Sequence, residues 1–232
     1  MKKSAFGETE RIMHHLMLNA YFIPDIGFFH GQMGVALTMS EYSRHVNNEI
    51  YFDVASYLLD NIMEKINENL IFSFASGLSG IGWGVEYLIQ NGFVEGEGVE
   101  ICEEIDQKIM KTDPRRIVDM SLDTGFEGIL HYVVYHLQGA FKKNTRLPFD
   151  ERYLSDLYAV CKLLKEQKND INMLLDIYID FYTTRTIKGY NMLITDFVTA
   201  ESTGLSEKLS SYPLGLKDGL AGKDLFVPEQ AT

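Results

Sequence analysis

The chain has 232 residues, of which 46% are hydrophobic and 23% charged, and this composition can bury one sizeable core, so we expect a single domain over residues 1–232. Its 33 acidic side chains outnumber its 21 basic ones and give a formal charge of -12, without a run of Lys or Arg that could follow a phosphate backbone. Nucleic acid and anionic membrane surfaces are therefore excluded as partners.

The first ten residues are polar, and no apolar run approaches the roughly 18 residues that a membrane span needs. We therefore expect a cytoplasmic protein that does not enter the membrane. The two cysteines, Cys102 and Cys161, lie far apart in apolar stripes of predicted helices. Their placement indicates neither a disulfide framework nor a paired-cysteine metal site.

The strongest pattern along the chain is a repeated Gly-x-x-Gly followed by an apolar helix. The first glycines of successive motifs are 46, 48 and 94 residues apart. Because 94 is twice 47, a further unit without its glycines is predicted near residue 172, in the helical segment 170–186, which makes about five units. The marked pairs are Gly31 and Gly34, Gly77 and Gly80, Gly125 and Gly128, and Gly219 and Gly222.

Each period has room for two helices. Residues 51–67, 99–110 and 150–164 carry apolar side chains on one face, as half-exposed outer helices do. Residues 80–90 and 128–137 are apolar around most of their circumference, which is typical of inner helices covered on several sides. The only short strand candidate is 71–75. The sequence thus predicts an all-α fold of about five helical hairpins whose inner helices begin at Gly-x-x-Gly.

A glycine pair at a helix start allows two interpretations. Glycines three residues apart let a neighbouring backbone approach closely, and they leave the first-turn N–H groups uncovered. Helix starts gathered on one face would then bind an anionic or carbonyl-bearing ligand. Alternatively, the glycines serve only tight turns and helix contacts.

The segments HGQMG, SGLSGIGWG, TGFEGILHY and GLKDGLAG together resemble the lanthionine-synthetase-C-like (LanC-like) family, over residues 28–225. This resemblance implies an α/α toroid of helical hairpins around a central cavity. Its best-known members cyclise ribosomally made peptides by adding a cysteine thiol to a dehydrated serine or threonine. Five hairpins are fewer than such a cyclase has, so a smaller ring, an open arc or completion by a second copy of the chain are the expected arrangements.

In those family members a zinc ion held by two cysteines and one histidine activates the thiol. Their ligands lie in Trp-Cys-x-Gly and Cys-His-Gly units, and neither occurs here, since Phe29 rather than a cysteine precedes His30. We therefore predict no metal ligands and no cofactor.

Several side chains near the glycine motifs could still carry chemistry. His30 directly precedes the first motif, and Asp123 and Glu127, with Asp119, surround the third. These are candidate catalytic groups. Two of them also have a structural explanation: His30 could bond to the backbone of its loop, and Asp123 could cap the helix that follows. The residues predicted to line the cavity or bind a ligand are Trp83, His131 and the glycines Gly31, Gly34, Gly77, Gly80, Gly125, Gly128, Gly219 and Gly222. For Trp83, a position in the hydrophobic core is an alternative explanation. His136 is expected to point away from His131, so the two share no metal.

Three functions remain open from the sequence. The first is a zinc-independent, non-catalytic LanC-like protein that binds a peptide substrate or a modification enzyme during peptide maturation. The second is a lanthionine-forming cyclase that works through His30 and the acids near Gly125. The third is a glycoside hydrolase, a reaction that α/α toroids also house and that needs two carboxylates, for which Glu86, Asp123, Glu127 and Asp218 are candidates.

Overall fold

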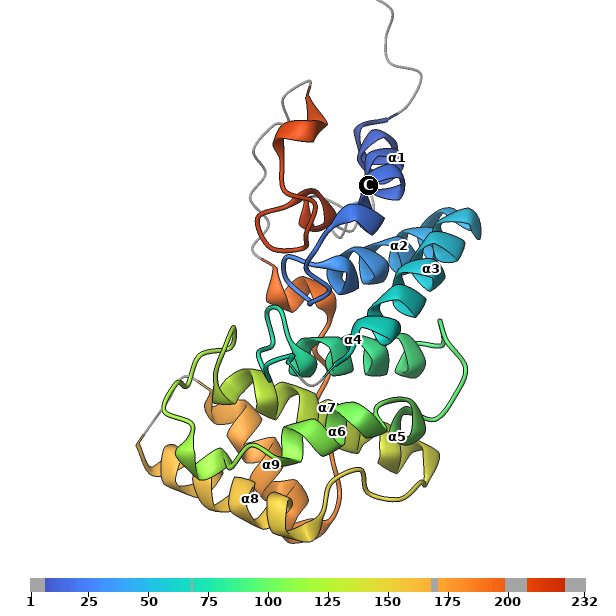
Figure 1. Cartoon of the computed structure of the whole chain (residues 1–232). Helices are drawn as coiled ribbons and strands as arrows, with labels where there is room; N and C mark the ends of the chain where they lie inside the picture. Colours follow the sequence, from blue (N-terminus) through green and yellow to red (C-terminus); the bar gives the residue numbers. More distant parts are fainter. Residues whose placement is uncertain (1–6, 68, 168–170, 199–207, 224–232) are drawn as a thin grey trace, which may run out of the picture. The chain divides into compact units, whose positions relative to one another are not determined.

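The computed structural model describes residues 7–67, 69–167, 171–198 and 208–223. Throughout these ranges the regular structure is helical and no residue is in a strand, which confirms the predicted all-α class. The chain divides into two compact units, residues 1–67 with 192–232, and residues 68–191. Each unit is described by itself (Figure 1), and the organisation of residues 1–232 as one domain stays a prediction.

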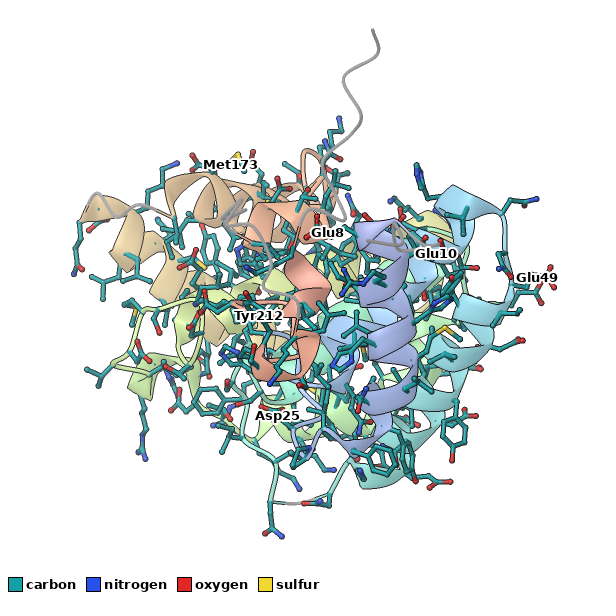
Figure 2. All side chains as sticks on the ribbon, turned by 90° about the horizontal axis from the view of Figure 1, so that it is seen from above. Glu8, Glu10, Asp25, Glu49, Met173 and Tyr212 are labelled. Carbon is teal, nitrogen blue, oxygen red and sulfur yellow. The ribbon has the colours of Figure 1, made fainter. Side chains whose placement is uncertain are left out.

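The described residues of unit 1 form three α-helices and four 3-10 turns. Helices α2 and α3 form a hairpin (Figure 1), because Asn47 takes the left-handed conformation at φ 52° and ends α2. The acidic side chains of Glu8 and Glu10 lie in the first turn of α1 (Figure 2), where the helix dipole favours them. The elements of unit 1 are α1 (Glu8–Asn19), η1 (Ala20–Phe22), α2 (Gln32–Val46), α3 (Ile50–Lys65), η3 (Ile194–Phe197), η4 (Leu209–Ser211) and η5 (Leu220–Gly222).

The core of unit 1 joins the two ends of the sequence. Helix α3 packs one face inward, as its apolar pattern predicts, while most of α2 is buried. The turn η5 contributes Leu220 and Ala221 to the same core, and Thr38 Oγ1 in α2 donates a 3.0 Å hydrogen bond to the carbonyl of Ala221. The last glycine motif thus packs directly on the helix of the first.

Unit 2 is centred on two helices that follow glycine motifs. Helices α4 and α7 pack side by side, and α8 and α9 form a hairpin. Asp150 caps α8 by accepting the N–H of Tyr153 at 2.7 Å, and Asn144 ends α7 at φ 53°. The elements are α4 (Leu78–Gln90), α5 (Gly98–Ile101), α6 (Glu103–Met110), η2 (Pro114–Arg116), α7 (Phe126–Lys143), α8 (Glu151–Glu166) and α9 (Asn172–Thr184).

The predicted contrast between the two kinds of helix is confirmed. In α4 every residue from Leu78 to Ile89 is buried, whereas α8 buries one face. Helix α9 begins at the position predicted for the unit without glycines. Within the described residues, no helix is both long and apolar enough to cross a bilayer.

Three local predictions are wrong. Residues 71–75 are a loop rather than a strand, because their carbonyl groups accept N–H groups from the start of α4. The helix predicted over 99–110 is broken at Cys102 into α5 and α6. The last motif begins only the 3-10 turn η5, and Lys223 is not helical; residues 224–227 of the expected final helix lie outside the described residues.

Candidate functional site

The four marked glycine motifs share one backbone geometry. In each, the residue after the first glycine donates its N–H to the carbonyl seven positions earlier, so the preceding loop folds back over the helix start. The expectation that the first-turn N–H groups are uncovered is therefore wrong at this position. The four bonds run from Gln32 to Asp25 (2.9 Å), Leu78 to Ile71 (2.9 Å), Phe126 to Asp119 (2.9 Å) and Leu220 to Pro213 (2.8 Å).

The motif glycines are buried where a side chain would collide with a neighbour. A Cβ on Gly31 would lie 2.7 Å from the carbonyl oxygen of Asp25, and one on Gly77 would lie 2.9 Å from that of Ser73. The same holds for Gly125, Gly219, Gly34, Gly128 and Gly222, each of which faces loop backbone or a packed side chain, and Gly80 is buried in α4. Close packing accounts for these glycines, and ligand binding by them stays a prediction.

Neighbouring motifs also pair through equivalent positions. In unit 1 the N–H of Lys217 donates to the carbonyl of Phe29 at 2.9 Å, and in unit 2 the N–H of Ala75 donates to the carbonyl of Asp123 at 2.9 Å. All four residues stand two positions before the first glycine of their motif. Each pair of loops is thereby joined by a backbone hydrogen bond at the same position of the motif.

The predicted catalytic residues fall in different units. His30 lies in unit 1 with an exposed side chain, whereas Asp123 and Glu127 lie in unit 2 and are partly exposed. The carbonyl of Asp123 also accepts the Ser73 hydroxyl at 2.8 Å, so its backbone joins two glycine loops.

Three predicted residues come together around a tyrosine that the sequence did not signal. The hydroxyl of Tyr190 accepts the indole N–H of Trp83 at 2.8 Å and lies 2.9 Å from Nδ1 of His131. Nε2 of His131 lies 3.9 Å from Oε1 of Glu127. Gln138 holds the loop of Tyr190 by donating to its carbonyl at 2.9 Å. This cluster of Glu127, His131, Tyr190 and Trp83 is the candidate site.

The candidate site is mostly enclosed. Trp83 is fully buried among aromatic rings, and Tyr190 and His131 are 2% and 6% exposed, whereas about a quarter of the Glu127 side chain reaches solvent. The imidazole of His131 lies within hydrogen-bond distance of the buried Tyr190 hydroxyl, and it faces the partly exposed carboxylate of Glu127 at the distance of an ion pair rather than of a hydrogen bond. The cluster therefore has the groups for acid–base chemistry, with Glu127 as the accessible one.

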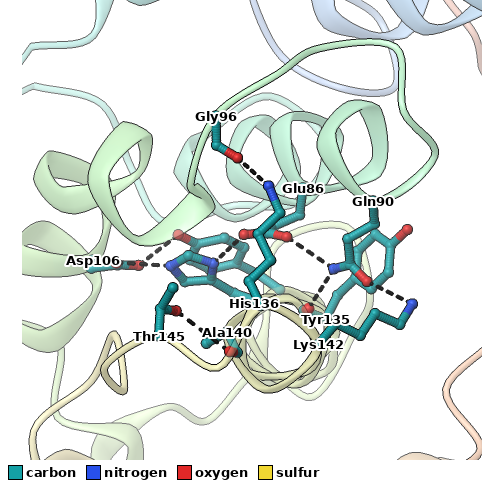
Figure 3. Close-up of polar contacts among 11 residues, drawn as sticks. Glu86, Gln90, Gly96, Asp106, Tyr135, His136, Ala140, Lys142 and Thr145 are labelled. Atoms are coloured by element: carbon teal, nitrogen blue, oxygen red, sulfur yellow. Dashed lines mark hydrogen bonds and ion pairs between the residues drawn. The ribbon is translucent and has the colours of Figure 1, made fainter.

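A second buried polar network lies in unit 2 and was missed by the sequence interpretation (Figure 3). Nδ1 of His136 contacts Oε1 of Glu86 at 2.5 Å, and its Nε2 contacts Oδ2 of Asp106 at 3.0 Å. Tyr132 donates its hydroxyl to the other oxygen of Asp106 at 2.6 Å, and Gln90 donates to the other oxygen of Glu86 at 2.9 Å. Every carboxylate oxygen thus has a partner.

Burial and charge set the protonation of this network. Burial lowers the pKa of His136, but its hydrogen bonds to Asp106 and Glu86 outweigh burial and raise the pKa to about 9. Burial raises the pKa of Asp106, against the bonds from His136 and Tyr132 that lower it. His136 is therefore a buried cation between two carboxylates at neutral pH.

Glycines make room for the network. A Cβ on Gly98 or on Gly139 would collide with the carboxylate of Glu86, and one on Gly82 would meet the ring of Tyr132, 2.7 Å from its Cζ. Beside Glu86 lies a cavity of about 150 Å³ whose wall also includes Gln90, Gly98, Gly139, Lys142 and Lys143. The ammonium group of Lys142 donates to the side-chain oxygen of Gln90 at 3.0 Å.

The residues present do not fit the zinc site that the resemblance to the LanC-like cyclases implies. Cys102 and Cys161 are both fully buried, and burial raises the pKa of both thiols, which disfavours the thiolate that zinc binds. In the part of the chain that the structure describes, no three His, Cys, Asp or Glu side chains are placed to share a metal ion. In the Glu86 network, the two nitrogens of His136 face separate carboxylates instead.

The described residues are helical, and three of the four Gly-x-x-Gly motifs, those at Gly31, Gly77 and Gly125, follow a one-sided helix and begin a largely buried one, which defines a helical-hairpin repeat protein. The sequence model of the family described as "Lanthionine synthetase C-like protein" matches residues 25–176. Because this match covers more than half of the 232 residues, the chain belongs to the LanC-like family. Neither a curated protein nor a solved structure matches the chain.

Proposed function

We propose that this LanC-like protein acts in the maturation of a ribosomally made peptide without zinc, by binding the peptide or its modification enzyme in the cytoplasm. The observation that carries the proposal is the burial of both thiols, Cys102 and Cys161, in a chain with the family's glycine framework. A zinc cyclase needs two thiolates at its cavity, and thiols that are 0% exposed do not supply them.

Two measurements test the absence of zinc-dependent cyclisation. Protein purified with zinc present and then dialysed is expected to hold far less than one zinc per chain by elemental analysis. A synthetic peptide with one dehydroalanine and one cysteine is expected to lose free thiol no faster with the protein than without it. Near-stoichiometric zinc, or thiol loss that a chelator stops, would contradict the proposal.

One observation favours cyclisation without metal as a second candidate. The Glu127 and His131 pair, 3.9 Å apart, could remove the thiol proton of a bound peptide at a partly exposed carboxylate. In that case the wild-type protein would consume free thiol in the presence of chelator. Glu127→Gln would abolish this activity, whereas the matched variant Glu151→Gln at the start of α8 would keep it. Thiol loss that both variants retain rules this candidate out.

A further inference from the structure

Unit 1 presents a group of exposed, mostly aromatic side chains. It consists of Leu18 at the end of α1, Tyr21 and Phe22 in η1, and Tyr57 on α3, which are 75%, 44%, 76% and 58% exposed. The ring centroids of Tyr21 and Tyr57 are 5.1 Å apart, and those of Tyr21 and Phe22 are 5.9 Å apart. These four residues are called the aromatic patch. Large apolar side chains exposed as a group mark a contact surface.

A buried polar link holds the aromatic patch in place. The side-chain amide of Gln32, which is fully buried, donates to the carbonyl groups of Tyr21 and Ile23 at 3.0 and 2.9 Å. Its oxygen accepts from Asn61 of α3 at 2.5 Å, one turn after Tyr57. The turn that carries Tyr21 and Phe22 is therefore tied to the helix that carries Tyr57. A surface held in its binding conformation loses little entropy on association.

Acidic side chains extend from the aromatic patch along α3. Asp53, Tyr57, Asp60 and Glu64 are all exposed, and their spacing places them on one face of the helix. A hydrogen bond to Tyr21 raises the pKa of Tyr57, with the smallest contribution coming from the charge of Glu64, two turns further along α3. Lys65 is the only basic residue in α3. The three acids are called the acidic stripe.

We propose that the aromatic patch and the acidic stripe together bind a cationic peptide segment that alternates apolar and basic side chains. The apolar side chains cover the rings, and the Lys or Arg side chains pair with the three carboxylates and with the exposed ring faces. An anionic bilayer is repelled by the same carboxylates, and a second copy would bring one acidic stripe against another in a chain of charge -12. This inference rests on the proposed role in peptide binding and specifies where the peptide lies and what charge it carries.

The test uses the full chain and a short fluorescein-labelled peptide of alternating Leu and Lys, with a peptide of alternating Leu and Glu as its counterpart. Fluorescence anisotropy is expected to show binding of the basic peptide only, weakened at about 0.5 M salt by screening. The double variant Phe22→Ser/Tyr57→Ser is expected to lower the affinity about tenfold or more, as loss of central aromatic contacts does. The control variant Leu163→Ser/Met173→Ser removes two side chains of comparable exposure, 57% and 65%, from unit 2 and should leave the affinity unchanged.

A second pair of variants separates local charge from net charge. Asp60→Lys/Glu64→Lys is expected to lower the affinity about tenfold at low salt, whereas Glu97→Lys/Glu100→Lys, with the same change of net charge, should not. All these positions are exposed, and equal thermal midpoints will show that folding is unchanged.

Four results would overturn the inference: no binding of the basic peptide, equal binding of the acidic peptide, equal losses in the control variants, or a wild-type dimer in light scattering that the variant Phe22→Ser/Tyr57→Ser dissociates. None of these outcomes changes the zinc content or the thiol measurements. Failure here is therefore distinguishable from failure of the proposed function.

Discussion

His136→Gln is expected to destabilise unit 2 strongly, because it removes the cation that lies between two buried carboxylates. The side chains of His136, Glu86 and Asp106 are 0%, 1% and 3% exposed. Taking one partner out of such a network leaves charge buried without compensation, which costs about 3–5 kcal/mol. Folding raises the pKa of His136 from its ordinary value of 6.5 to about 9. At about 1.36 kcal/mol per pKa unit, this shift corresponds to about 3 kcal/mol of stability.

The same network predicts a pH dependence with a definite sign. Because folding raises the pKa of His136, its contribution to stability is complete below pH 6.5 and is lost as the pH rises through about 9. The free energy of unfolding of the wild-type protein is thus expected to fall by about 3 kcal/mol across this window. The triple variant Glu86→Gln/Asp106→Asn/His136→Gln, which lacks all three ionisable groups, should be nearly flat there.

Urea denaturation measures both effects, and Trp83 provides a local probe. It is the only tryptophan and lies buried in α4, so its fluorescence reports on unit 2, whereas circular dichroism reports on all helices. The triple variant Glu86→Gln/Asp106→Asn/His136→Gln is the control, and it should recover at least half of the loss because the two buried charges are gone. A loss below about 1 kcal/mol in the single variant, or no recovery in the triple variant, refutes the reasoning.

Three further predictions concern packing. Gly128→Ala should lower the free energy of unfolding, measured in urea, by about 1–3 kcal/mol, because the new methyl group would collide with the carbonyl of Leu122 and the side chain of Phe74. In Gly7→Ala the methyl group would meet no neighbour, and the free energy of unfolding should change by less than about 0.5 kcal/mol. Ellman's reagent should leave Cys102 and Cys161 unmodified in the native protein and label both in guanidinium, and rapid native labelling would contradict their burial. Tyr190→Phe should cost about 1–3 kcal/mol and shift the tryptophan emission, since the indole and the imidazole lose the hydroxyl between them; an unchanged spectrum would count against that contact.

The repeat and the two kinds of helix could be predicted because each depends on local pattern. A helix covered on all sides must be apolar all round, and a glycine that faces backbone tolerates no other residue, so α4, α7 and the motif spacing leave clear signals. The break at Cys102 leaves no such signal, since the apolar stripe continues through it. The loop over 71–75 is apolar because Phe74 and Ala75 are buried, while the carbonyl groups of Ile71 and Ser73 bond to the start of α4 rather than to a strand.

The polar network could be predicted only in part. Glu86 and His136 stand in buried, largely apolar stretches of α4 and α7, and a buried ionisable group of this kind needs a partner. The partners, however, are 50 and 30 residues away along the chain, and only the packing of α4, α6 and α7 brings them together. In the same way Tyr190, 59 residues after His131, belongs to no motif, so the cluster around it was not foreseen as a unit.

The contact between the first and the last glycine motif has a consequence for how the chain folds during its synthesis. Thr38 and Ala221 are 183 residues apart, and unit 1 takes its core from both segments, whereas unit 2 is one continuous stretch. On the ribosome, unit 2 can fold as soon as its own residues emerge, while α1, α2 and α3 wait for the C-terminal segment with their shared apolar faces uncovered. Those three helices are the part of the nascent chain that a chaperone would need to shield.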